Sequence, residues 1–267
     1  MASPRALILS GYGLNCEEET LFAFEKAGAS GSIIHINDLA ESPETLADYQ
    51  ILAVPGGFSF GDDTGSGNAY ASRLKNHLWD ALLAFIERDT LMIGICNGCQ
   101  VLANLGLTPA PGNPRGTRDV ALLHNASGRY QCRWVDLKPD GNSPWMRGIE
   151  HLHIPVAHGE GNFYMEEKTL NAFRASGQIA ARYVKPDGAP ANGNFPENPN
   201  GAMDDIAAVT DASGRVLIMM PHPERAIFFT QREDWPLLKE QFKRAGKPLP
   251  EHGDGLKLFE NGVRYFQ

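Results

Sequence analysis

Cys96 stands where a buried strand is expected to turn sharply into a helix. The apolar run 90–95 ends at this thiol, and the segment 96–100, CNGCQ, leads directly into a further apolar run. Gly94 and Gly98 flank the cysteine at the second position on either side, as a tight strand-to-helix elbow requires. Unpaired backbone N–H groups and the positive end of the helix dipole lower the pKa of a thiol at such a place. The pattern therefore predicts a nucleophilic cysteine.

Two other interpretations of Cys96 are open at this point. Free cysteine is commonly a small buried hydrophobe, which would make Cys96 part of the core. Cys96 and Cys99 also form a Cys-x-x-Cys pair, the pattern of a redox couple or of half a zinc site. The sequence contains no second pair of this kind to complete a zinc site, so we expect no metal here.

His222 and Glu224 follow a second apolar run, 216–220, and two prolines constrain the backbone around the histidine. In an extended segment residues i and i+2 project to the same side, so the carboxylate of Glu224 can orient the imidazole. His222 could then accept the proton of Cys96 and deliver it to a leaving amine. A rigid turn with solvated polar groups is the alternative for this segment alone. Taken with the elbow, the pattern favours a Cys–His–Glu triad.

Backbone N–H groups that could stabilise an oxyanion follow the apolar run 51–54. Attack by Cys96 on an amide or thioester carbonyl generates a negatively charged oxygen, which needs hydrogen-bond donors fixed in advance. Gly57 and Phe58 can offer N–H groups because glycine tolerates the required dihedral angles. Asn97 supplies the N–H after the nucleophile. A Gly-Gly pair after a strand is also common in ordinary turns.

Further side chains could line the same pocket. Gln100 lies one helical turn from the cysteine, and the loop 158–161 contains His158, Gly159 and Glu160. Plain packing or loop structure is the alternative for each of them. We expect all four residues at the substrate.

Composition and charge exclude several classes of partner. The 267 residues carry a formal net charge of −8, which argues against nucleic acid as the main partner. No apolar stretch approaches the ~18 residues that span a bilayer, and the N-terminal residues enter a strand with no room for a signal peptide. Four scattered cysteines do not suggest a disulfide framework, and a reactive thiol requires a reducing compartment. We expect a cytoplasmic protein, not bound to a membrane, with a small-molecule substrate.

The elements that must position these residues alternate between strand and helix in the first hundred residues. Apolar runs predict strands over 5–10, 32–36, 51–54 and 90–95. Helical spacing predicts helices over 16–27, 43–48 and 69–88. Successive units of this kind imply a parallel sheet covered on both faces, whose ligands collect at the C-terminal strand ends. Gly57 and Cys96 both fall at such ends.

The second half is expected to be richer in strands. The predicted strands cover 130–137, 152–157, 179–184, 206–210 and 216–220. Loops are expected over 106–128 and 186–201, and helices over 235–245 and 255–266. The predicted fold is therefore α/β, with a mostly parallel central sheet flanked by helices and additional antiparallel strands in the second half. We expect a single domain over 1–267.

Five segments together resemble the class I, or triad, glutamine amidotransferases. They are 55–62 (PGGFSFGD), 94–100 (GICNGCQ), 157–161 (AHGEG), 198–201 (NPNG) and 220–225 (MPHPER). More narrowly, they resemble the glutaminase components of phosphoribosylformylglycinamidine synthases. The resemblance covers about residues 5–266 and implies the class I amidotransferase fold.

By this resemblance, Cys96 is the nucleophile that forms a γ-glutamyl thioester, His222 is the acid and base, and Glu224 orients His222. The groups implied at the oxyanion and at bound glutamine are Gly57, Phe58, Asn97 and Gln100. The released ammonia would pass to a synthetase subunit that uses ATP and formylglycinamide ribonucleotide in purine biosynthesis. A small accessory subunit would be a further partner of this assembly.

No G-x-x-x-x-G-K-[ST] loop occurs in the sequence, so ATP and Mg are expected on the synthetase partner, and no cofactor is expected in this chain. One segment departs from the family pattern. Residues 63–67, DTGSG, stand where small stand-alone subunits usually continue with Tyr-Leu-Arg, which favours a domain of a large fused form. Two alternatives remain: a glutaminase serving another acceptor, such as a nucleotide base or a chorismate-type substrate, and a non-catalytic binding or regulatory module.

Overall fold

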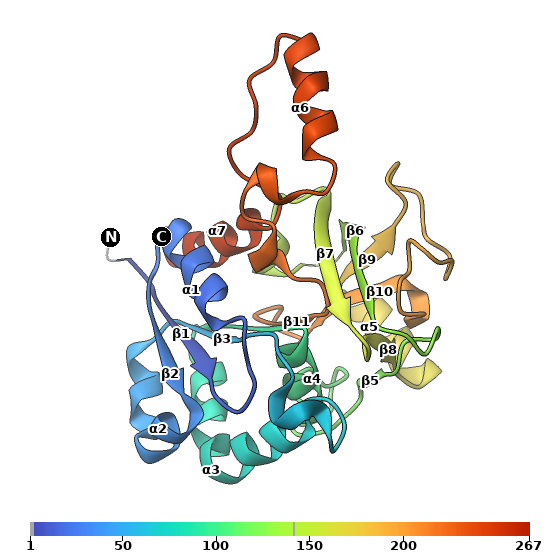
Figure 1. Ribbon diagram of the computed structural model, residues 1–267. Coiled ribbons are helices and arrows are strands. Elements are labelled where there is room, and N and C mark those ends of the chain that lie inside the picture. The colour runs from blue at the N-terminus through green and yellow to red at the C-terminus, as the bar shows by residue number, and fades with distance from the viewer. Residues whose placement is uncertain (1–2, 141) are drawn as a thin grey trace.

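A computed structural model describes residues 3–140 and 142–267, so residues 1, 2 and 141 of the predicted domain lie outside the described residues. The described residues form one mixed central sheet with helices packed around it (Figure 1). Its strands lie in the order β2 (Ser30–His35), β1 (Arg5–Ser10), β3 (Ile51–Val54), β4 (Leu91–Ile95), β11 (Val216–Met219), β10 (Ile206–Thr210), β9 (Ile179–Val184), β6 (Gln131–Pro139) and β7 (Leu152–His158).

The first five strands of this order are parallel to one another. All the side chains of β3, β4 and β11 are buried, as expected for strands covered on both faces. The helices around this half are α1 (Glu17–Lys26), α2 (Ile36–Glu41), α3 (Asn68–Glu87), α4 (Asn97–Asn104) and α7 (Leu256–Arg264). In Figure 1, α1 and α7 lie together on one side of these strands, and α2, α3 and α4 lie on the other.

The other half of the sheet is antiparallel. β10 pairs with β11 and β9, and β6 pairs with β9 and β7, all in antiparallel register. A separate two-stranded sheet joins β5 (Ala121–Leu123) to β8 (Asn162–Tyr164). The predicted fold class, a mostly parallel sheet with antiparallel strands added from the second half, is confirmed.

Four elements differ from the sequence prediction. The helix α5 (Glu167–Ser176) was not predicted, because only Leu170 and Phe173 are buried on it and the apolar period is short. β5 lies inside the predicted loop 106–128, and β8 was also not predicted, since three residues are too few to show an alternating pattern. Ile36 was placed at a strand end but begins α2, where its side chain is buried.

The helix α6 (Trp235–Arg244) extends away from the body of the molecule (Figure 1). None of its residues is buried. No helix among the described residues is long and apolar enough to cross a membrane.

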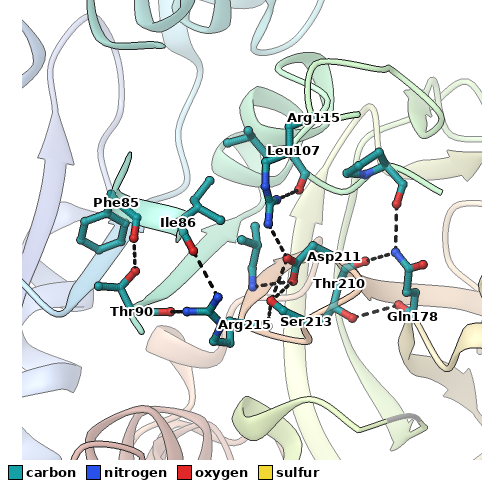
Figure 2. A network of polar contacts seen from close by, with 12 residues as sticks. Phe85, Ile86, Thr90, Leu107, Arg115, Gln178, Thr210, Asp211, Ser213 and Arg215 are labelled. Atoms are coloured by element: carbon teal, nitrogen blue, oxygen red, sulfur yellow. Dashed lines mark hydrogen bonds and ion pairs between the residues drawn. The ribbon is translucent and has the colours of Figure 1, made fainter. Parts of the chain in front are cut away.

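A polar network ties together the ends of β4 and β11 that are remote from Cys96 and His222. Figure 2 shows Asp211 at its centre, in the turn between β10 and β11. One carboxylate oxygen of Asp211 accepts from Nη2 of Arg115 at 2.8 Å, and the other accepts from the N–H of Val216 at 3.1 Å. Nη2 of Arg215 donates to the carbonyl of Ile86 at 3.2 Å. The start of β11 is thereby fixed to the end of α3.

Candidate active site

Cys96 occupies a strained elbow between β4 and α4. Its backbone has φ 52° and ψ −107°, a combination that non-glycine residues rarely adopt and that recurs at functional sites. Its N–H donates to the carbonyl of Met219 at 2.8 Å, which holds the elbow against β11. A Cβ atom at Gly98 would lie 1.8 Å from the carbonyl oxygen of Val54, so only glycine lets α4 pack this closely on β3.

The thiol of Cys96 lies in the wall of a cavity of about 520 Å³. Only 6% of the residue is accessible, and its Sγ donates to the carbonyl oxygen of Ala157 at 3.6 Å. The residues around the cavity include Gly57, Phe58, Gln100, His158, Gly159 and Glu160. Six of the predicted substrate-binding residues therefore surround the predicted nucleophile.

His222 and Glu224 form a buried pair at the end of β11. Nδ1 of His222 lies 2.6 Å from Oε1 of Glu224, and both side chains are almost fully excluded from solvent. The backbone N–H of His222 donates to the carbonyl of Pro155 at 2.8 Å, which fixes the segment against β7. Because the carboxylate accepts the Nδ1 proton, Nε2 is left as an acceptor, and it has no hydrogen-bond partner among the described residues.

Electrostatics around His222 favour its charged form. Burial by itself lowers the pKa of the imidazole, but the negative charge of Glu224 and contacts with Cys96 and Cys16 outweigh it. The pKa of His222 is therefore raised well above its usual value. A histidine in this state can stabilise a thiolate and return a proton to a leaving group.

Gly56 shows how closely these groups approach one another. A Cβ atom added there would lie 2.8 Å from Cε1 of His222, 3.1 Å from Sγ of Cys16 and 3.4 Å from Cβ of Cys96. The structure thus brings Cys96, His222 and Glu224 together although 126 residues separate the cysteine from the histidine.

The three predicted oxyanion donors differ in their availability. The N–H of Phe58 donates to the carbonyl of Gly13 at 2.8 Å, so it is not free to hold an oxyanion in this structure. Gly57 donates to no described residue, and Asn97 lies in the first turn of α4, where N–H groups lack partners within the helix. Gly57 and Asn97 are therefore the available pair.

The side chains of Asn97 and Gln100 brace the cavity wall. Asn97 accepts from the N–H of Ser59 at 3.1 Å and donates to Oε1 of Gln100 at 2.8 Å. Nε2 of Gln100 donates to the carbonyl of Glu160 at 2.6 Å. Both ends of the Gln100 amide are engaged by the protein. This residue, predicted to contact glutamine, therefore supports the wall that faces the substrate.

Two carboxylates lie at one side of the cavity. Oε2 of Glu160 accepts from the N–H of Ser66 at 3.3 Å, and Asp62 accepts from Nδ2 of Asn97 at 3.3 Å. Burial, together with the neighbouring charge of Glu160, raises the pKa of Asp62 despite hydrogen bonds to its carboxylate. Asp62 lies within one of the family-like segments, but neither it nor Ser66 was selected from the sequence. The pair of carboxylates suits a ligand with an ammonium group.

His158 is buried beneath this wall. Nδ1 of His158 lies 3.1 Å from Oδ1 of Asn125, an atom that also accepts from the N–H of Gly161. This arrangement assigns the proton to Nδ1 of the histidine. Burial lowers the pKa of His158 to about 3, so the ring stays neutral. The next residue, Gly159, accepts from the N–H of Asn125 at 2.9 Å.

Sequence reasoning missed Cys16 and Arg225. Nη2 of Arg225 donates to Sγ of Cys16 at 2.9 Å. Nothing in the sequence relates the two residues, which are 209 positions apart. Cys99 is fully buried in α4, and burial raises the pKa of its thiol well above the usual value.

Two groups of side chains bring three possible metal ligands within 4.8 Å of one another: Cys16 with His222 and Glu224, and His153 with Glu233 and Asp234. In the first group, Glu224 already accepts from Nδ1 of His222. In the second group, the carboxylate of Asp234 is paired with Arg232 at 2.8 Å. Neither group contains the Cys96 and Cys99 pair.

Comparison with known proteins agrees with this geometry. Residues 3–266 match the family described as the CobB/CobQ-like glutamine amidotransferase domain. A protein named phosphoribosylformylglycinamidine synthase subunit PurQ, from Methanococcus maripaludis strain S2, is 49% identical over 98% of this chain and 97% of its own. A protein of the same name from Dehalococcoides mccartyi is 39% identical over 99% of this chain and 98% of its own.

Solved structures show the same fold. The structure titled PurLQS from Thermotoga maritima superposes with a TM-score of 0.71 and 30% identity, covering 100% of both chains. A putative GMP synthase component from Thermoplasma acidophilum superposes with a TM-score of 0.53 over 99% of this chain and 95% of its own, at 10% identity, which shows the fold alone. The two curated relatives are named as subunits, and these names do not support the fused form expected from residues 63–67.

Proposed function

The chain belongs to the CobB/CobQ-like glutamine amidotransferase family, and from this premise we propose that it is the glutaminase subunit of a phosphoribosylformylglycinamidine synthase. It hydrolyses glutamine to glutamate and ammonia and supplies the ammonia to a synthetase subunit that acts on formylglycinamide ribonucleotide. Relatives of that name match it over nearly their whole lengths. The observation that carries the chemistry is the buried pair of His222 and Glu224 beside the strained Cys96.

The triad performs the reaction in two stages. Nε2 of His222 takes the proton of Cys96, and the thiolate attacks the side-chain amide carbon of glutamine. The N–H groups of Gly57 and Asn97 stabilise the oxyanion that forms. His222 then gives its proton to the leaving nitrogen, ammonia departs, and a γ-glutamyl thioester remains on Cys96. His222 then deprotonates a water molecule, which attacks the thioester carbon; the C–S bond breaks, glutamate leaves, and His222 returns the proton to the sulfur of Cys96.

The cavity distinguishes the two charged ends of glutamine. Glu160 and Asp62 line the part of the wall that would hold the α-ammonium group, because paired carboxylates stabilise a cation there. Arg129 also lines the cavity and offers a guanidinium to the α-carboxylate. The side-chain amide then points towards Cys96.

ATP and Mg belong to the synthetase partner in this proposal. The sequence has no G-x-x-x-x-G-K-[ST] loop, and the cavity beside Cys96 is lined for an amino acid. A small accessory subunit completes the assembly. The four cysteines are free thiols, and a nucleophilic thiol needs a reducing environment, which supports a cytoplasmic location.

The test combines this chain with its synthetase partner, ATP, Mg and formylglycinamide ribonucleotide. The parent chain should support product formation with either glutamine or ammonium chloride as the nitrogen source. Cys96→Ala should abolish the reaction with glutamine and leave the reaction with ammonium chloride unchanged. Product formation from glutamine by the variant would contradict the proposed nucleophile. Stimulation of glutamine hydrolysis by a different acceptor would reassign the acceptor.

A further inference from the structure

Arg225 lies between the carboxylate of the triad and a second thiol. Its Nη2 donates to Sγ of Cys16 at 2.9 Å, and its Nε lies 4.0 Å from Oε1 of Glu224. The reaction steps above use neither Arg225 nor Cys16. We propose that Arg225, held in place by Cys16, is a positioning residue that sets the pH range in which His222 works, acting through the carboxylate of Glu224. This inference rests on the proposed function.

Cys16 is a fixed anchor for the guanidinium. Its N–H donates to the carbonyl of Gly56 at 3.2 Å, and its own carbonyl accepts from Oγ1 of Thr20 at 2.6 Å. Its thiol is fully buried and lies 3.4 Å from Oδ1 of Asn15, to which it donates. Burial raises the pKa of Cys16, which keeps the sulfur a neutral acceptor. The anchor therefore connects Arg225 to the segment that carries the oxyanion donor Gly57.

A second carboxylate, that of Glu19, also lies close to the guanidinium of Arg225. Oε1 of Glu19, in the first turn of α1, lies 3.9 Å from Nε of Arg225. Glu19 is partly exposed, whereas Glu224 is fully buried. Because solvent screens the exposed pair more strongly, the cation acts mainly on Glu224.

The direction in which Arg225 shifts the pKa of His222 follows from the positive charge of the guanidinium. Glu224 stabilises the imidazolium form of His222, and a cation 4.0 Å from the same carboxylate oxygen weakens this stabilisation. Arg225 thus offsets part of the rise in the pKa of His222 that Glu224 causes. Without the guanidinium, the imidazolium should persist to higher pH. Loss of Arg225 should therefore move the acidic limb of activity upwards.

Other titratable groups also surround His222. They are Glu224 on its own segment, Cys96 at the elbow, Cys16 at the start of α1, His158 at the end of β7, and Tyr130 before β6. Among the described residues, Arg225 is the one basic residue, Lys or Arg, whose side-chain nitrogen lies within 4.0 Å of a carboxylate oxygen of Glu224. Its charge is permanent, so its effect persists over the whole working range of pH.

The experiment measures two pH profiles in the assembled complex with the synthetase. One is kcat/KM for glutamine hydrolysis, and the other is the rate of iodoacetamide alkylation at Cys96, read by peptide mapping. Arg225→Met should move the acidic limb of both profiles upwards by roughly one pH unit, and Arg225→Lys by less. Cys16→Ser, whose hydroxyl can still accept from the guanidinium, should move the limb less than Arg225→Met does. Arg244→Met on the exposed α6 serves as the matched control.

An unmoved acidic limb in folded Arg225→Met, with activity lowered equally at every pH, would overturn the proposal. If that variant does not fold, Arg225→Gln, which also removes the charge, decides the question, and an unmoved limb in Arg225→Gln has the same meaning. The alkylation profile needs no ribonucleotide substrate. Failure to form amidated product would therefore count against the proposed function, and the profile would still test Arg225.

Discussion

Nδ1 of His222 and Oε1 of Glu224 lie 2.6 Å apart in an environment closed to solvent. This contact assigns the ring proton to Nδ1 and leaves Nε2 for the thiol of Cys96. It also places a negative charge beside the imidazole, which raises the pKa of His222 against the opposing effect of burial. One hydrogen bond therefore determines both the orientation of the base and the pH at which it works.

Replacing the carboxylate should lower activity and shift its pH range. In Glu224→Gln the side-chain carbonyl can still accept from Nδ1, but the charge is lost. Burial then dominates, so the pKa of His222 falls and the acidic limb of kcat/KM moves to lower pH. We expect glutamine hydrolysis to fall by about 10²–10⁴-fold. Initial rates between pH 5 and 9 provide the measurement, with Glu240→Gln on α6 as control. A limb that moves upwards would contradict this assignment.

Gly57→Ala should disturb the oxyanion site. Gly57 has φ +153°, and an added Cβ would lie 2.4 Å from the carbonyl oxygen of Gly13. The segment after β3 would have to move, which displaces the N–H of Gly57 from the reacting carbonyl. We expect kcat to fall by about 10²–10³-fold. Gly188→Ala is the matched control, because nothing lies within 4 Å of the added Cβ at that position. Equal kcat values in both variants would exclude Gly57 as a donor.

Asp211→Asn should reduce stability without changing catalysis. Asp211 is buried and paired with Arg115 at 2.8 Å, and the network lies at the start of β11, at the end of the sheet remote from Cys96. Loss of the charge leaves the guanidinium of Arg115 without a counter-ion. Since solvent reaches part of Arg115, the free energy of unfolding should fall by only about 2 kcal/mol. Urea unfolding should show this loss. Asp48→Asn, which breaks an exposed pair with Arg5, should cost less than about 0.5 kcal/mol. Equal losses would refute the role of burial.

A cluster at the edge of the sheet should make stability depend on pH. Asp136 lies 3.0 Å from both His151 and His153. Burial would raise the pKa of Asp136, but the two histidines lower it below its usual value. For His153, burial lowers the pKa, and hydrogen bonding to Asp136 outweighs it, so the pKa is raised.

The two pKa shifts define the pH range in which the cluster stabilises the folded protein. The contribution of Asp136 is present above about pH 4 and lost on acidification, and that of His153 is present below about pH 6.5 and lost as the pH rises through its folded pKa. His153→Gln should therefore destabilise the protein by about 1 kcal/mol more at pH 5.5 than at pH 8.5. Urea unfolding at the two pH values tests this, with the exposed His77→Gln as control. A difference of the opposite sign would contradict the assignment.

Much of the fold could be predicted because buried strands leave a clear apolar signal. The strands β1, β3, β9 and β10 begin and end where the sequence places them. The helix α5 and the short strands β5 and β8 escaped prediction, because each buries too few side chains to show a period. Contacts with the rest of the fold stabilise these three elements, whose local sequence has no clear apolar period.

The candidate site, like the fold, was predictable from the sequence only in part. Residue types and strand ends were enough to select Cys96, His222 and Glu224, because each follows an apolar strand and chemistry restricts the choice. Phe58 was selected on equal grounds with Gly57, yet its N–H is used by Gly13. No local pattern reports that hydrogen bond, since the partner lies in another segment.

The sequence by itself therefore selected the candidate nucleophile, its candidate base and the edge of the sheet at which they meet. Only the tertiary structure decided which N–H groups are available and which charges surround the base. Cys16 and Arg225 illustrate the reason: 209 residues separate them, and their contact exists because α1 and the turn after β11 pack on the same side of Gly56. Contacts between distant segments depend on how the elements pack, and short motifs do not encode that packing.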